Sequence, residues 1–225
     1  MEPREFHWPF SFLYSSLARF MEPGYRDLSN RMEIGDGAES LLDVGGGDGR
    51  LAISLAQTYP GLQHIVSGDI SKDMTRRAQR RVAEAGLSST IVAECLDMHA
   101  LPYSEARFDA VVSFGALHHA RQPLVVLAEA YRVLRPGGRM CVIDGYGRPS
   151  FAVIREAVRG FGGSFVAAVM YWCGSKDCLS RDRIASLVSG GRLRGIDVVF
   201  DGPLAIINGT KESMENEVLV ESDAG

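Results

Sequence analysis

The stretch Leu41–Ala52 reads Leu-Leu-Asp-Val-Gly-Gly-Gly-Asp-Gly-Arg-Leu-Ala and decides the fold. Residues 41–44 are an apolar run with one acid, which is typical of a buried strand. The glycines at 45, 46, 47 and 49 predict a tight turn, because glycine adopts positive φ and lets a ligand approach the main chain. The turn opens a helix, whose N-terminus offers unpaired N–H groups. The stretch therefore predicts a strand, a glycine loop and a helix that bind a nucleotide, although an ordinary strand-to-helix turn stays open.

The spacing of the glycines separates two classes of nucleotide ligand. A dinucleotide fingerprint reads Gly-x-Gly-x-x-Gly and uses its third glycine for helix packing. Counted from Gly45, that glycine falls at position 50, which is Arg50. The pattern here is instead Asp43-x-Gly45-x-Gly47-x-Gly49. A nicotinamide dinucleotide is therefore the less favoured ligand.

Length and charge fit one α/β domain with an elaboration. The chain has 225 residues and a formal net charge of −4. Its basic residues are dispersed apart from a run at positions 76, 77, 80 and 81, where the helical spacing is typical of a solvated helix face. We therefore expect no nucleic-acid partner.

The sequence also indicates a cytoplasmic protein. Glu2, Arg4 and Glu5 precede an aromatic cluster rather than the apolar run of a signal peptide. The longest apolar stretch, 160–173, is too short to span a bilayer, so we expect no transmembrane segment. The four cysteines have no histidine pair beside them, and we expect no metal site.

Short apolar runs alternate with amphipathic stretches between residues 41 and 144, which predicts parallel strands joined by crossover helices. We expect strands near 41–44, 64–68, 90–95, 108–114 and 138–144. We expect helices near 49–58, 72–86 and 122–135, with Ser71 as an N-cap and a glycine turn at 136–138. The fold class is a doubly wound α/β sheet.

The regions before residue 41 and after residue 144 do not show this regular alternation. Residues 1–35 are rich in aromatic side chains and predict a helical cap segment that packs on the domain of residues 36–210. Within that domain, 151–190 is expected to be a helical insert with an apolar part at 151–172 and a short helix at 181–189 capped by Ser180. Two strands, Ile196–Phe200 and Leu204–Ile207, predict a terminal antiparallel hairpin. The polar tail 211–225 is expected to be disordered.

Residues suited to a nucleoside follow the second and third predicted strands. Asp69 ends the second strand, 26 residues after Asp43, and a carboxylate there can accept hydrogen bonds from both ribose hydroxyls. Asp97 and Met98 follow the third strand, where an acid can accept from an adenine amino group and an apolar neighbour can pack on the ring. Ile70 and Met74 are candidates for the opposite apolar wall, with a helix-core role equally open for Met74. An Asp that merely caps the next helix is the alternative for position 69.

Taken together, residues 41–144 resemble the class I S-adenosylmethionine-dependent methyltransferases, in the branch that includes the ubiquinone and menaquinone C-methyltransferases. The resemblance implies a seven-stranded sheet of order 3-2-1-4-5-7-6 with strand seven antiparallel. It implies S-adenosylmethionine as cofactor and methyl transfer as the reaction. The residues that it assigns to the cofactor are Asp43, Gly45, Gly46, Gly47, Asp69, Ile70, Met74, Asp97, Met98 and Phe114, with the three glycines on the methionyl part and Phe114 on the open side.

The acceptor is expected to be a small molecule. No Asn/Asp-Pro-Pro-aromatic segment follows the fourth strand, and there is no Pro-Cys nucleophile, so methylation of nucleic-acid bases is not favoured. The aromatic N-terminus and the apolar insert favour an apolar or aromatic acceptor.

The end of the fourth strand carries the candidates for a general base. His118 and His119 stand beside the expected methyl position, and an imidazole titrates near neutral pH. Adjacent residues point in different directions, so we expect one of them, His119, to face the methyl group. Tyr14 and Tyr25 are weaker candidates for closing the pocket. We interpret the segment from Arg132 through the end of the fifth strand as structural.

Two functions from other classes stay open at this point. An NAD(P)-dependent oxidoreductase would use the same strand, loop and helix. A non-catalytic nucleoside-binding or assembly protein would keep Asp69 and the loop without turning over an acceptor.

Overall fold

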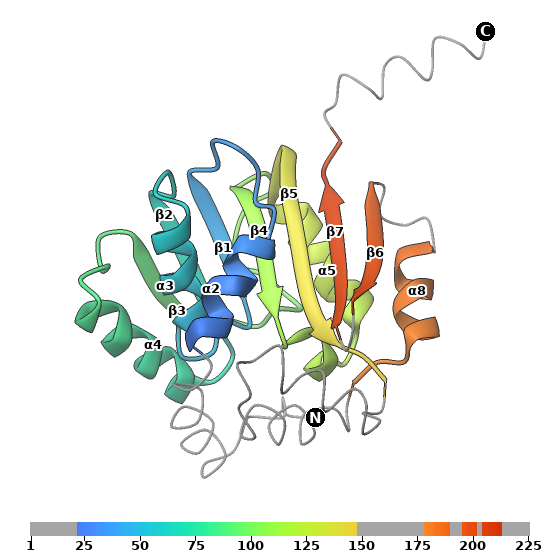
Figure 1. Ribbon diagram of the computed structural model, residues 1–225, viewed down its shortest axis with the longest axis horizontal. Coiled ribbons are helices and arrows are strands. Elements are labelled where there is room, and N and C mark those ends of the chain that lie inside the picture. Colours follow the sequence, from blue (N-terminus) through green and yellow to red (C-terminus); the bar gives the residue numbers. More distant parts are fainter. Residues whose placement is uncertain (1–21, 148–177, 190–194, 202–203, 213–225) are drawn as a thin grey trace, which may run out of the picture.

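The computed structural model describes residues 22–147, 178–189, 195–201 and 204–212. Within these ranges seven strands form one sheet in the order β3-β2-β1-β4-β5-β7-β6 (Figure 1). The strands are β1 (Ser40–Val44), β2 (His64–Asp69), β3 (Ile91–Cys95), β4 (Phe108–Phe114), β5 (Leu134–Gly145), β6 (Ile196–Asp201) and β7 (Leu204–Thr210). The described helices are α2 (Glu22–Arg31), α3 (Arg50–Thr58), α4 (Lys72–Glu84), the 3₁₀ turn η2 (Leu117–His119), α5 (Pro123–Val133) and α8 (Arg181–Ser189). The expected fold class and strand order are confirmed.

The strand directions also agree with the expectation. β1 pairs in parallel with β2 and β4, β2 with β3, and β4 with β5. β7 runs antiparallel to both β5 and β6. The carboxyl ends of β1 to β5 therefore meet at one edge of the sheet, where open α/β sheets bind their ligands.

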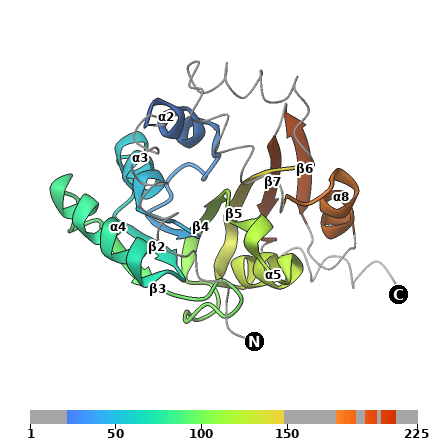
Figure 2. The same cartoon turned by 90° about the horizontal axis from the view of Figure 1, so that it is seen from below.

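Helices cover both faces of the sheet. Seen from below in Figure 2, α2, α3 and α4 lie on one side, and α5 and α8 lie on the other. Leu41 is fully buried in the cluster with α2 and α3, whereas Leu42 is fully buried in the cluster with α5 and α8. Successive side chains of a strand point to opposite faces, so a strand covered on both sides reads as a continuous apolar run.

One boundary differs from the prediction. The helix expected to reach residue 135 ends at Val133, and β5 begins at Leu134, so the expected glycine turn lies inside the strand. The register against β4 shifts between Phe108 and Ala110. Gly137 donates its N–H to the Lys211 carbonyl at 2.7 Å, and the Lys211 N–H donates to the Gly138 carbonyl at 3.0 Å. The turn becomes strand because residues distant in sequence pair with it.

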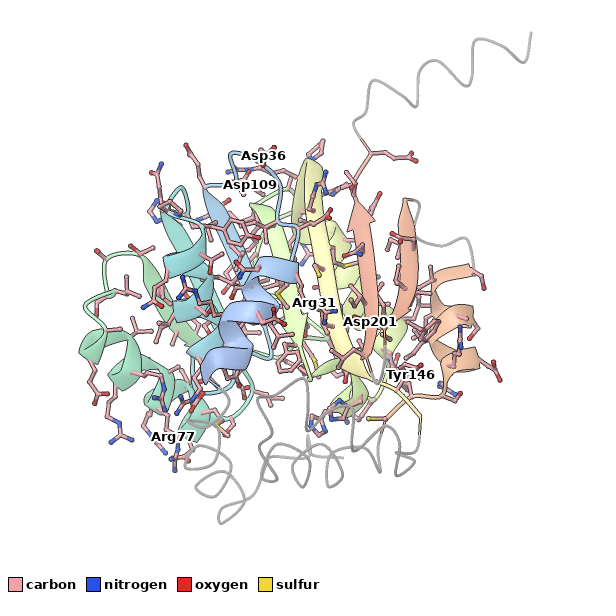
Figure 3. All side chains as sticks on the ribbon, in the orientation of Figure 1. Arg31, Asp36, Arg77, Asp109, Tyr146 and Asp201 are labelled. Atoms are coloured by element: carbon pink, nitrogen blue, oxygen red, sulfur yellow. The ribbon has the colours of Figure 1, made fainter. Side chains whose placement is uncertain are left out.

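The local signals of α8 and the hairpin are confirmed. Ser180 Oγ accepts a hydrogen bond from the Arg183 N–H at 3.3 Å, as an N-cap does. Arg31 of α2 forms an ion pair with Asp201 of β6, which joins the N-terminal helix to the hairpin (Figure 3). The apolar part of the insert at 151–172, the first 21 residues and the tail beyond 212 lie outside the described residues.

The two edges of the sheet can be followed in Figure 3. Asp36 and Asp109 lie at the edge where the parallel strands begin, and Tyr146 lies at the edge where β5 ends. The glycine loop after β1, Asp69 at the end of β2 and the η2 turn after β4 belong to the second edge. In the part of the chain that the structure describes, no helix has the length and apolar character needed to cross a membrane.

Candidate functional site

A pocket opens at the carboxyl end of β1. Its described lining consists of Tyr25, Asp43, Gly45, Gly46, Gly47, Asp48, Leu51 and Phe114. Five of these eight residues are cofactor candidates from the sequence, namely Asp43, the three glycines and Phe114. The tertiary structure thus brings the end of β4 against the loop that follows β1.

The glycine loop holds its shape through its own amides. Gly45 and Gly46 both donate to the Gly68 carbonyl, at 2.8 and 2.9 Å. The Gly47 N–H donates to Asp69 Oδ2 at 3.0 Å, and the Gly49 N–H to the Gly46 carbonyl at 3.0 Å. These four glycine amides are therefore already hydrogen-bonded within the protein, to the neighbouring strand and to the loop itself.

Glycine is required at two of these positions because a side chain there would overlap neighbouring atoms. A Cβ on Gly45, whose φ is +74°, would overlap the Cβ of Ala116 in the segment after β4. A Cβ on Gly46 would overlap Ser67 Oγ and approach Asp43 Oδ2 to 2.7 Å. The loop can therefore pack against β2 and the segment after β4 only because Gly45 and Gly46 have no side chains.

Asp43 is a buried carboxyl with spare hydrogen-bonding capacity. It has no exposed surface, and Ser67 Oγ donates to its Oδ2 at 3.4 Å. Among the described residues, its Oδ1 has no hydrogen-bond partner. Burial raises the pKa of Asp43 to about 7, the Ser67 hydrogen bond opposes that rise, and the nearby Asp69 charge adds to it. The pocket thus contains an acid that forms no ion pair with a cationic side chain among the described residues.

This pKa predicts how stability depends on pH. A carboxyl with a higher pKa in the folded state binds its proton more tightly there, so its contribution to stability falls as pH rises from about 4 to about 7. We expect Asp43→Asn to unfold like the wild type near pH 4, where the carboxyl is protonated in the folded state and about half protonated in the unfolded state, and to be more stable by ~1 kcal/mol or more at pH 8. Urea unfolding of the ligand-free proteins at both pH values checks this. Equal free energies of unfolding at pH 8 would contradict it.

Asp69 ties the loop to the next helix. Its Oδ2 accepts from Gly47, and its Oδ1 accepts from the Ser71 N–H at 2.8 Å. Burial raises the pKa of Asp69, although these two hydrogen bonds oppose the rise. Ser71 in turn caps α4, since its Oγ accepts from the Met74 N–H at 3.4 Å. The carboxylate therefore has a structural role in the loop as well as any role toward a ligand.

Arg50 occupies the place of the third dinucleotide glycine, and its contacts show why. Its side chain is 5% exposed, and its Nε lies 3.2 Å from Asp48 Oδ2. Arg81 of α4 also reaches this oxygen, at 2.9 Å, and donates to the Asp48 carbonyl at 3.2 Å. The Asp48 carboxylate and its two arginines fasten the loop to α3 and α4. No sequence pattern predicted this network, and Arg81 is not simply part of a solvated face.

The adenine candidates lie further along the same edge. Asp97 Oδ1 accepts from the His99 N–H at 2.9 Å and from His99 Nδ1 at 2.8 Å. Burial raises the pKa of Asp97, but the hydrogen bonds from His99 outweigh this, and the pKa lies below its ordinary value. An ionised acceptor is therefore in place after β3. Met98 packs against the core cluster around α5.

Met74 and Ile70 were expected to form an apolar wall beside the cofactor. Met74 is 5% exposed within α4, as a helix-core residue would be, and Ile70 is half-buried at the start of the α4 connection. The described lining of the Asp43 pocket includes neither residue, nor Asp69, Asp97 or Met98. These five cofactor candidates stay predictions.

The end of β4 brings His118 onto a carboxylate of β5. His118 Nδ1 lies 2.7 Å from Asp144 Oδ1, and the His118 N–H donates to Asp144 Oδ2 at 2.9 Å. The side chains of His118 and Asp144 are 10% and 4% exposed. His119 is exposed, and its ring centroid is 3.9 Å from that of His118. The buried contact with Asp144 therefore distinguishes His118 from His119, and it involves a residue that the sequence interpretation treated as structural.

Tyr25 reaches the pocket from α2. It is 6% exposed, and its ring meets that of Phe114 edge to face, with centroids 6.1 Å apart at 82°. The N-terminal segment thus contributes a wall to the site, in line with the role suggested for this residue. Tyr14 lies outside the described residues.

Comparisons with known proteins agree with this geometry. A family model for a methyltransferase domain matches residues 41–138. The chain is 37% identical over 134 residues to the 27-O-demethylrifamycin SV methyltransferase of Amycolatopsis mediterranei, covering 58% of this chain and 48% of that protein. It is 35% identical over 108 residues to the ubiquinone/menaquinone biosynthesis C-methyltransferase UbiE of Desulfotalea psychrophila, covering 48% of this chain and 42% of that one. The matches thus span less than half the length of these two relatives.

A solved structure extends the likeness of the fold beyond the matched region. A Methanococcus maripaludis protein assigned to the S-adenosyl-L-methionine-dependent methyltransferases superimposes with a TM-score of 0.70 at 21% identity. The superposition covers 91% of each chain. At this identity the likeness concerns the fold.

Proposed function

Residues 41–138 belong to the methyltransferase-domain family of the S-adenosylmethionine-dependent class I enzymes, and on that premise we propose that the chain transfers a methyl group from S-adenosylmethionine to a small molecule. The observation that carries the proposal is the pocket between the Gly45–Gly47 loop and Phe114, with the buried Asp43 carboxyl in its wall. Open α/β sheets bind nucleosides at this edge.

The residues present fit such a cofactor. The unpartnered Oδ1 of Asp43 suits a ligand that brings a cation with N–H donors, as the methionyl ammonium does. Asp69 accepts one protein N–H on each oxygen, and a carboxylate oxygen accepts more than one hydrogen bond, so capacity for a ribose diol remains. The missing side chains of the loop leave room for the methionyl chain.

Positioning is the main task of the protein in this reaction. A sulfonium supplies a methyl group that is already activated for transfer. Holding an acceptor atom in line with that group can lower the barrier by roughly 7–11 kcal/mol. The described elements that would set this line are the loop after β1 and the segment from Phe114 to His118, which touch each other at Gly45 and Ala116.

The acceptor is proposed to be small and apolar or aromatic. Tyr25, Leu51 and Phe114 contribute apolar side chains to the lining of the described pocket. The names of the two relatives point the same way, since one acts on 27-O-demethylrifamycin SV and the other in ubiquinone and menaquinone biosynthesis. Such acceptors suit a wall that is aromatic rather than charged.

Calorimetry with three ligands tests the proposal. We expect the protein to bind S-adenosylmethionine and S-adenosylhomocysteine with micromolar affinity and to bind NADH at least a hundredfold more weakly. We expect Asp36→Ala, on the opposite edge of the sheet (Figure 3), to bind like the wild type. Binding of NADH in place of the sulfonium would favour an oxidoreductase. Tight cofactor binding without any methylated product across a broad acceptor panel would favour a non-catalytic binding protein.

A further inference from the structure

We infer that Asp43 holds a proton in the ligand-free protein and gives it up when a ligand ammonium binds, so that this carboxyl makes the pocket selective for nucleosides with an amino acid end. The inference rests on the proposed function and deepens it, because it names the part of the cofactor that the site selects and the proton that leaves on binding. Asp43 lines the pocket at the end of β1, and its side chain is completely buried.

The hydrogen bonds of Asp43 are too few for a buried carboxylate. Ser67 Oγ donates to its Oδ2 at a distance of 3.4 Å, which is long for a bond to a charged oxygen, and its Oδ1 has no hydrogen-bond partner among the described residues. Asp69, at the end of the next strand, instead accepts a main-chain N–H on each oxygen, at 3.0 and 2.8 Å. A buried carboxylate without hydrogen bonds and without a cation is costly, and such a group takes up a proton instead. The contacts of Asp43 therefore predict a neutral carboxyl in the ligand-free protein.

The second carboxyl of the pocket has the cations that Asp43 lacks. Asp48 lines the same pocket, and its Oδ2 lies 3.2 Å from Nε of Arg50, the first residue of α3. Arg81 of α4 reaches the same oxygen at 2.9 Å. A ligand cation at Asp48 would have to compete with two arginines. Of the two acids, Asp43 is therefore the one that a ligand cation can pair with directly.

The remaining neighbours of Asp43 supply no positive charge. The sheet register places Ser67 of β2 on one side of it and Val112 of β4 on the other, and α2 brings the phenol of Tyr25 to the pocket. Asp69 at the end of β2 adds a negative charge, which disfavours a second one nearby. Burial raises the pKa of Asp43 to about 7, in agreement with this set of neighbours, although the Ser67 hydrogen bond opposes the rise. The group is then largely protonated at pH 6 and largely ionised at pH 8.

A ligand cation beside Asp43 changes which form of the carboxyl is stable. An opposite charge within about 4–6 Å favours the ionised form. The O–H bond of Asp43 breaks and its proton passes to solvent, while the ligand ammonium keeps its three protons and becomes the counter-ion of the carboxylate. A nucleoside without the amino acid end leaves Asp43 neutral, and no proton leaves. Below pH 7 the protein has to lose a proton in order to bind the complete ligand, so the affinity for that ligand falls as pH falls.

Calorimetry of the full chain counts this proton. S-adenosylhomocysteine is titrated at pH 6 and pH 8 in buffers of different ionisation enthalpy, because the dependence of the heat on that enthalpy gives the number of protons exchanged. 5′-Methylthioadenosine is the matched ligand, since it has the same nucleoside and a thioether but no amino acid end. We expect S-adenosylhomocysteine to release about 0.9 proton more than 5′-methylthioadenosine at pH 6 and about 0.1 more at pH 8. We also expect the preference for S-adenosylhomocysteine over 5′-methylthioadenosine to be about tenfold greater at pH 8 than at pH 6.

Two variants and one spectrum assign the proton to Asp43. Asp43→Asn keeps the size of the side chain but does not titrate, so the difference between the two ligands in proton release should disappear. Asp36→Asn makes the same change at an exposed position on the opposite edge of the sheet and should release protons like the wild type (Figure 3). Infrared difference spectra of the wild-type chain at pH 6 need no variant. We expect the C=O stretch of a protonated carboxyl to disappear with S-adenosylhomocysteine and to persist with 5′-methylthioadenosine.

The outcomes separate this inference from the proposed function. Equal proton release by the two ligands at pH 6 overturns the inference and leaves the proposed function standing. The same holds if the extra proton is still released by Asp43→Asn, because another group is then its source. A chain that binds neither ligand contradicts the proposed function, and the inference fails with it.

Discussion

Gly45→Ala is expected to lower the free energy of unfolding by ~3 kcal/mol or more. Two independent costs add at this position. The new Cβ would overlap the Cβ of Ala116, which is 8% exposed in the closely packed segment after β4. The backbone φ of +74° adds about 1–2 kcal/mol for a residue with a side chain. Guanidinium unfolding followed by circular dichroism measures the sum.

A substitution at a second glycine measures the backbone cost without the steric overlap. Gly37 has a φ of +80°, and a Cβ built on it would meet nothing within 4 Å. Gly37→Ala therefore carries the backbone cost without the overlap and should lose about 1–2 kcal/mol. The pair Gly45→Ala with Ala116→Gly should recover much of the overlap cost. If Gly45→Ala were no worse than Gly37→Ala, the close approach of the loop to the segment after β4 would be wrong.

Asp69→Ala is expected to weaken the binding of S-adenosylhomocysteine by tenfold or more. The change removes the acceptor of the Gly47 and Ser71 N–H groups, which sets the loop against α4. It also removes the carboxylate proposed to bind the ribose. Hydrogen bonds to a charged group contribute about 1.5–3 kcal/mol each, so one lost ribose contact alone exceeds the 1.4 kcal/mol of a tenfold change. Isothermal titration calorimetry measures the affinity.

Two further variants test whether the loss of S-adenosylhomocysteine affinity comes from the Asp69 carboxylate. Asp69→Asn has one carbonyl oxygen and can accept only from one of the two amides at full strength, so its affinity should fall between those of the wild type and Asp69→Ala. Asp36→Ala removes an equal charge from the opposite edge of the sheet and should leave affinity unchanged (Figure 3). An Asp69→Ala protein that binds with wild-type affinity would exclude Asp69 from the site.

Much of the fold follows from local pattern. Apolar runs of four to seven residues such as 41–44 and 108–114, separated by amphipathic stretches, give parallel strands with crossover helices, and the structure has them. Capping residues such as Ser71 and Ser180 act where the sequence places them. The segment after α5 was predicted wrongly. The glycine turn expected there is part of β5, because Lys211 pairs with it.

The lining residues that could be predicted are those marked by a local sequence pattern at the end of a strand. The glycine loop, Asp43 and Phe114 lie at strand ends, and the topology of a parallel sheet brings such ends together. The sequence interpretation chose His119, whereas Asp144 of another strand contacts His118, and no local pattern contains that contact. Tyr25 of α2 lines the pocket, and Arg81 of α4 forms an ion pair with the lining residue Asp48, so these contacts also depend on elements that lie apart in the sequence.

Hydrophobic period and glycine spacing act over a few residues, and they were enough to predict the strands, the helices and the glycine loop after β1, while the resemblance to a methyltransferase family supplied the strand order. The packing alone established that the Gly45, Gly46 and Gly47 amides donate to Gly68 and Asp69, that the Asp43 carboxyl is buried, and that His118 contacts Asp144. Hydrogen bonds and desolvation depend on which groups meet in space. That information lies in contacts between residues 22 to 26 positions apart in the sequence, and no local pattern contains it.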